Sequence, residues 1–108
     1  MERSVPYDGR TYTVRVHHVE GPDPLVVVLS ATCDTNPDDV GYCGYTRVPR
    51  GHRQGWRWAQ VGDIVSDPGE CLGAARENPW SSSTPDSATI TQLEWAREHA
   101  QTGPQAGA

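Results

Sequence analysis

Three cysteines and four histidines are the side chains here with the chemistry for metal binding or nucleophilic attack. Thiolates and imidazoles are the ligands that zinc prefers in a tetrahedral site. Such a set would consist of Cys33, Cys43, His52 and Cys71. Their gaps are long and irregular, and no Cys-x-x-Cys pair pre-forms half of a site. We therefore expect no cofactor, with zinc as the less favoured alternative.

The odd number of thiols also bears on their redox state. A Cys33–Cys43 bridge would close a short loop but leave Cys71 unpaired. Reduced thiols that pack like small hydrophobic residues are the better interpretation. A cysteine paired with a histidine base would make a small thiol enzyme. No spacing in the chain indicates that such a pair meets.

Two polar segments have a partial metal-binding pattern. His17 and His18 are neighbours on a predicted strand, so they should point to opposite faces and cannot chelate one ion together. The segment 34–39 alternates oxygen-bearing side chains like the start of a calcium loop. It has Asp39 where such a loop needs glycine and Tyr45 where it needs glutamate. We expect a polar surface loop instead.

Lysine is absent, because all nine basic residues are arginines. Schiff-base chemistry, a phosphate-binding P-loop lysine and a Ser/Lys dyad are therefore excluded. There is also no Gly-x-Ser-x-Gly nucleophile turn. Because the sequence contains no recognisable set of catalytic residues, we favour the interpretation that the protein is not an enzyme.

Arginines and aromatic residues gather in one stretch, where Arg47, Arg50, Arg53 and Arg57 surround Trp56 and its neighbours. Such a mixture can hold single-stranded nucleic acid by phosphate contact and stacking. The net charge of −5 argues against nucleic acid or an anionic membrane as partner. No run is long and apolar enough to span a bilayer, and the first residues lack a secretory signal, so we expect a cytoplasmic protein.

Strand signals fill the first two thirds of the chain. Residues 11–19 alternate, with Tyr12, Val14, Val16 and His18 predicted on one face. Residues 25–29 form an unbroken apolar run, typical of a central strand covered on both faces. A reversal at 21–24 makes the two an antiparallel hairpin. Further strands are predicted at 45–48 and at 56–65, the latter bent at Gly62.

Helix signals follow the strands. Asp67, Pro68 and Glu70 predict the start of a helix that Asn78 and Pro79 end. After a serine-rich connector, Thr91 and Glu94 have the spacing of a capping box, with Ile90 and Trp95 as its hydrophobic staple. Leu93, Ala96 and Ala100 give this second helix a thin apolar stripe. Gly103 and Pro104 should end it.

These elements predict one α+β domain over residues 1–108. It has a β-rich core at 10–66, a helical segment at 67–102 and a flexible tail at 103–108. The sheet should be small and antiparallel, or a partly open barrel of about four strands, followed by two short C-terminal helices. Only 35% of the residues are hydrophobic, so the core must be small.

We expect the function to depend on contacts made by the protein surface and not on a catalytic centre. Arginine, tyrosine and tryptophan are over-represented at the centres of protein interfaces. We predict a small, acidic, non-catalytic module that binds a protein. The alternatives are a structural subunit of a larger assembly and a small Cys/His metal- or thiol-dependent enzyme. The predicted contact residues are Tyr42, Tyr45, Arg50, Arg53, Trp56, Trp58 and Trp95.

Overall fold

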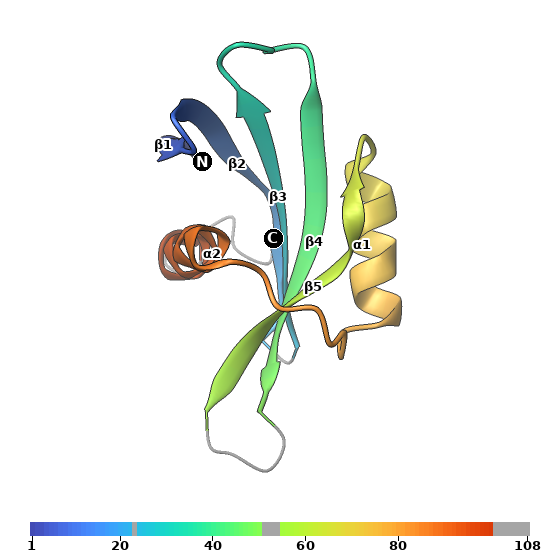
Figure 1. Ribbon diagram of the computed structural model, residues 1–108. Coiled ribbons are helices and arrows are strands. Elements are labelled where there is room, and N and C mark those ends of the chain that lie inside the picture. Colours follow the sequence, from blue (N-terminus) through green and yellow to red (C-terminus); the bar gives the residue numbers. More distant parts are fainter. Residues whose placement is uncertain (23, 51–54, 101–108) are drawn as a thin grey trace.

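The computed structural model describes residues 1–22, 24–50 and 55–100 and shows an open antiparallel sheet with a helix on each side (Figure 1). The strands are β1 (Glu2–Tyr7), β2 (Arg10–Glu20), β3 (Leu25–Cys33), β4 (Val40–Pro49) and β5 (Trp56–Val65). They lie in the sheet in chain order, and the helices α1 (Pro68–Glu77) and α2 (Ser87–Ala100) follow. The predicted α+β class is confirmed, with a sheet that does not close into a barrel.

The central strand β3 contributes core residues to both faces of the sheet. Leu25, Val27 and Leu29 pack with Leu93 of α2 on one face. Between them, Val26 packs on the opposite face with residues of β5 and α1. Because successive side chains on a strand point to opposite faces, an unbroken apolar run supplies both layers. We call these faces the α2 face and the α1 face.

The two faces are packed with side chains of different size. The α2 face is filled by large groups, including Tyr45 and Trp58. On the α1 face the helix comes close to β4, where Gly44 has no side chain to hold it away. A Cβ atom at Gly44 would lie 2.8 Å from the carbonyl oxygen of Cys71. Glycine at this position therefore allows α1 to pack directly on the backbone of the sheet.

The first strand, β1, was not predicted from the sequence. It pairs with β2 through a tight turn in which Asp8 and Gly9 have φ angles of 52° and 74°. Two residues with positive φ form the type of turn that best suits a two-residue hairpin, and Asp-Gly is a known signal for it. Val5 is the residue of this strand that packs against the hydrophobic core. The sequence of β1 therefore has almost no alternation of apolar and polar residues by which a strand could be predicted.

A bulge in β2 corrects the predicted placement of the two histidines. The pairing with β3 shifts between Val16 and His18, so Val16 and Val19 both pack on the α2 face. His17 and His18 then both lie on the α1 face. There His17 Nε2 is 2.8 Å from Ser30 Oγ, and His18 Nε2 is 2.7 Å from Glu20 Oε1. An inserted residue reverses the alternation that the prediction assumed.

The two helices differ in how well their starts were predicted. Asp67 caps α1 as expected, accepting a hydrogen bond from the backbone N–H of Gly69 at 2.9 Å, and the helix ends at Glu77. The capping box predicted at Thr91 is wrong, because α2 begins at Ser87. Asp86 supplies the cap, accepting from the Thr89 N–H at 2.8 Å. The predicted stop at residues 103–104 and the tail lie outside the described residues.

Candidate functional site

The predicted contact residues divide between the core and the surface. Tyr45 is 8% exposed and Trp58 is 5% exposed, and both belong to the cluster packed beneath α2. Trp56 lies two positions before Trp58 on the same face of β5, yet it is 44% exposed. The difference follows from the helix, which covers the sheet at Trp58 and not at Trp56.

Trp58 is held by a polar contact as well as by packing. Its indole Nε1 donates to Glu94 Oε2 of α2 at 2.6 Å. Glu94 also accepts from Arg97 at 2.7 Å and lies 3.9 Å from Arg47. Partial burial acts to raise the pKa of Glu94, but the hydrogen bonds from Arg97 and Trp58 outweigh it and lower that pKa. This anionic carboxylate ties α2 to the start of the β4–β5 hairpin.

Beyond α2, the β4–β5 hairpin carries basic and aromatic groups that are exposed or half-buried. The Arg47 guanidinium lies over the Trp56 ring, 5.1 Å from its centroid. Arg50 Nε donates to the Trp56 carbonyl at 3.0 Å, and the Arg50 N–H donates to Gly55 at 3.2 Å. We call Arg47, Arg50, Trp56 and Arg57 the hairpin surface. Arg57 follows Trp56 directly on β5, so its side chain lies on the other face of the hairpin.

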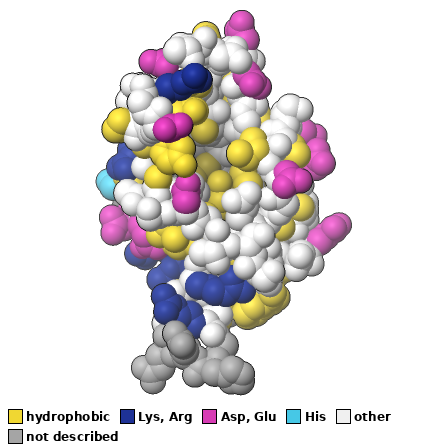
Figure 2. All heavy atoms as spheres, viewed as in Figure 1, with side chains coloured by type: hydrophobic (Ala, Val, Ile, Leu, Met, Phe, Trp, Pro, Cys, Tyr) yellow, Lys and Arg dark blue, Asp and Glu magenta, His cyan; other side chains and the backbone are white. Residues whose placement is uncertain are grey.

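The charge of the hairpin surface contrasts with the rest of the molecule. Figure 2 shows a group of basic side chains at the hairpin end, with others near the top and on the left, and acidic side chains spread over the upper and middle parts of this view. Among the described residues, neither Arg50 nor Arg57 forms an ion pair. Two guanidinium groups at this end are therefore not neutralised by carboxylates of the described chain.

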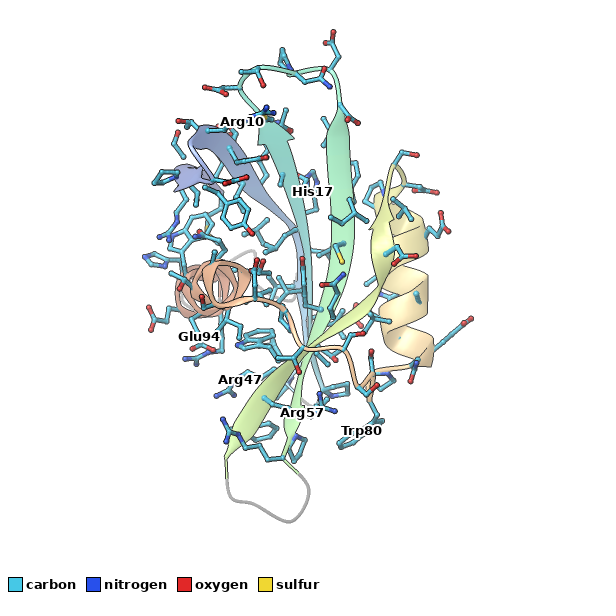
Figure 3. The ribbon with its side chains drawn as sticks, in the orientation of Figure 1. Arg10, His17, Arg47, Arg57, Trp80 and Glu94 are labelled. Atoms are coloured by element: carbon cyan, nitrogen blue, oxygen red, sulfur yellow. The ribbon has the colours of Figure 1, made fainter. Side chains whose placement is uncertain are left out.

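Another exposed tryptophan lies at the same end of the molecule. Trp80 is 60% exposed and follows α1, and Figure 3 shows it at the same end of the sheet as Arg47 and Arg57. The preceding residue, Pro79, is fixed to the sheet because its carbonyl accepts the Thr46 hydroxyl. Trp80 was not among the predicted contact residues. Its position after a proline, at the start of a polar connector, could have been used to predict an exposed tryptophan.

The remaining predicted contact residues lie elsewhere. Tyr42 is on the α1 face, with its ring 4.9 Å from the His17 ring in an edge-on arrangement. Trp95 is half-buried on α2, where the Arg3 guanidinium lies 4.7 Å from its ring centroid. Arg53 lies outside the described residues. The predicted set therefore does not form one continuous patch.

The three cysteines do not gather into the alternative zinc site. Cys43 packs on the α2 face, whereas Cys71 belongs to α1 on the opposite side of the sheet. All three thiols are free, and His52 lies outside the described residues. In residues 1–22, 24–50 and 55–100, no group of three or more His, Cys, Asp or Glu side chains is arranged to hold a metal ion.

The three thiols also differ in acidity. Hydrogen bonding to Thr35, whose Oγ1 lies 3.2 Å from the sulfur, lowers the pKa of Cys33. Burial raises the pKa of both Cys43 and Cys71. In the described part of the chain, the hydrogen-bond partners of Cys33 do not include a histidine. Among the described residues, therefore, no histidine stands beside Cys33 as the base that a thiol enzyme requires.

A groove lies on the α2 face beside the first turns of α2. Its volume is about 430 Å³, and its floor consists of side chains from several strands. Val14, Leu29, Ala31 and Tyr45 form the apolar part of the floor. Figure 2 shows a hollow bordered by hydrophobic side chains in the upper half of the molecule. No single stretch of the sequence indicates this groove, because residues far apart in the chain form it only when the sheet assembles.

Comparisons with protein-family models, curated proteins and solved structures found no match to this chain. Within the described ranges, neither helix has the length and apolar character needed to cross a membrane. The geometry of the hairpin surface and of the groove is therefore the basis for assigning a function.

Proposed function

We propose that this chain is a non-catalytic protein-binding module that contacts its partner through the hairpin surface. The observation that supports this best is Trp56, which is 44% exposed and is held in place by Arg47 over its ring and by Arg50 on its carbonyl. A pre-positioned aromatic ring flanked by arginines is typical of residues that contribute most to a protein interface. Because these side chains are already ordered, little conformational entropy is lost on binding.

The expected partner surface is acidic. Arg50 and Arg57 have no carboxylate partner among the described residues, so carboxylates of another protein are their natural ligands. Nucleic acid fits less well, because the net charge of −5 would repel a polyanion as it approached. A short acidic segment of a partner protein can contact the arginines locally, and it experiences less repulsion from the net negative charge of this chain than a long polyanion does.

The proposal is tested by affinity capture with matched variants. Immobilised wild-type protein, Trp56→Ala, Arg57→Ser and Arg15→Ser would be exposed to the same cell extract, and the bound proteins would be compared by mass spectrometry. Arg15 is the control because it is an exposed arginine on β2, paired with Glu2 at 2.9 Å, away from the hairpin. Thermal unfolding would verify that each variant is folded.

The expected result is a protein that wild type and Arg15→Ser retain, and that Trp56→Ala and Arg57→Ser lose by roughly tenfold or more. The purified partner should then bind with an affinity that falls as salt is added, since exposed charges are screened. Equal capture by all four proteins, or capture lost only with Arg15→Ser, would contradict the assignment to the hairpin surface.

A further inference from the structure

The groove beside α2 is a second candidate site, separate from the hairpin surface. Its volume of about 430 Å³ is within the range of small-molecule pockets in proteins. The floor is mainly apolar, and the charged residues that line it are Arg10 and Asp39. With one carboxylate and one guanidinium, the groove has no cluster of positive charge to bind an anion.

One buried polar side chain in this groove lacks a full set of partners. Gln92 on α2 is 7% exposed and lines the groove. Arg3 Nε donates to its Oε1 at 2.7 Å. Since a guanidinium can only donate, this contact fixes the orientation of the amide and leaves the Gln92 NH₂ group on the other side. No hydrogen-bond partner for that nitrogen exists among the described residues.

The Gln92 amide nitrogen is not fully covered by the described chain. No fully covered side-chain nitrogen or oxygen in the described chain lacks a partner, so the Gln92 nitrogen must reach accessible space. Gln92 and Tyr45 both line the groove, so a ligand in the groove can reach the accessible amide nitrogen. An accessible donor in a largely buried residue is paired when a water molecule or a ligand accepts its hydrogen bond.

We infer that this groove binds a small neutral molecule with an apolar body, whose carbonyl oxygen accepts a hydrogen bond from the Gln92 amide. The apolar body lies on the floor formed by Val14, Leu29 and Ala31, where its burial supplies most of the binding free energy. The carbonyl provides orientation and selectivity, since a matching compound without an acceptor leaves the Gln92 donors unpaired. This ligand site is independent of the proposed protein-binding function.

The test uses Prodan, a fluorescent and neutral naphthyl ketone, together with dimethylaminonaphthalene, which has a similar ring system but no carbonyl. Both would be titrated into wild type and three variants. Gln92→Glu keeps an oxygen for Arg3 but has no amide donor. Ala31→Leu fills the floor, and Thr32→Leu adds a similar apolar side chain at the next position of β3, which points to the opposite face.

Wild type should bind Prodan with a blue-shifted emission, roughly fivefold more tightly than the compound without the carbonyl. In Gln92→Glu that preference should disappear. Ala31→Leu should lose both compounds by roughly tenfold, whereas Thr32→Leu should bind both as wild type does. The inference is overturned if wild type binds neither compound, if it binds both equally, or if Ala31→Leu binds Prodan unchanged. These outcomes do not require a folded Gln92 variant.

Discussion

Trp58 and Trp56 lie on the same face of β5, and their surroundings separate the structural part of this molecule from the part available to a partner. Trp58 lies beneath α2, is 5% exposed and donates its indole N–H to Glu94. Trp56 lies past the edge of the helix, is 44% exposed and carries Arg47 on its ring. The same residue type therefore stabilises the fold at one position and is presented to solvent at the next. Coverage by α2 makes the difference.

The largest expected effect separates these two tryptophans by stability. Trp58→Ala should lower the free energy of unfolding by roughly 3–5 kcal/mol, because it leaves a cavity and removes one hydrogen-bond donor of Glu94. Trp56→Ala should change it by less than about 1 kcal/mol. Urea titrations followed by circular dichroism measure both. If the two variants were equally stable, the division between covered and presented positions would be incorrect.

The next effect concerns the opposite face of the sheet. Gly44→Ala should cost roughly 1–3 kcal/mol, since the added Cβ meets the backbone carbonyl of Cys71 at 2.8 Å and must displace α1. Gly73→Ala is the matched control. It lies in α1, where an added Cβ meets nothing within 4 Å apart from its chain neighbours and the backbone of its own helix, and it should stabilise the helix by about 0.5–1 kcal/mol. Opposite signs in thermal unfolding are the expected outcome; a neutral Gly44→Ala would show that α1 is not closely packed.

These positions show how far the sequence predicted the fold. The apolar run 25–29 and the cap at Asp67 gave correct elements, because their signals are local. The strand β1 was missed because it has little hydrophobic pattern and is held by pairing with β2. The bulge beside His17 could not be seen either, since an inserted residue leaves no mark on composition.

The candidate sites were less predictable than the fold. The stretch around Trp56 was identified correctly as rich in arginine and aromatic residues, but its neighbour Trp58 is distinguished only by the position of α2. Gln92 has no unusual sequence context. Its unpaired donors arise because Arg3, from the other end of the chain, occupies one side of the amide. Such relations between distant residues exist only after folding.

A smaller effect tests the electrostatic side of the comparison. Arg57→Glu should weaken binding of the captured partner by roughly tenfold, about 1.4 kcal/mol, because attraction to its carboxylates becomes repulsion. Arg76→Glu, at an arginine of α1 paired with Glu20, should leave that affinity unchanged. Isothermal titration calorimetry at two salt concentrations measures both. Equal losses would indicate a general charge effect in place of a local contact.

The smallest effect is expected in the pH dependence of stability. The hydrogen bonds of Arg76 and His18 to Glu20 lower the pKa of that carboxyl to about 2. A lowered pKa in the folded state stabilises the protein above the ordinary carboxyl range, and this stabilisation is lost as the pH falls toward about 2. The difference in Tm between wild type and Glu20→Gln should be present at about pH 5 and shrink as the pH falls below that. A difference that grows on acidification would contradict the pairing.

An NMR titration of isotope-labelled protein with the purified partner tests the central proposal most directly, because the indole and backbone N–H signals of Trp56 and Trp58 report on neighbouring positions. The hairpin surface as binding site predicts large shifts for the Trp56 indole and the Arg57 amide, with the Trp58 indole nearly unchanged. Shifts confined to residues outside the β4–β5 hairpin, with Trp56 unaffected, would contradict it.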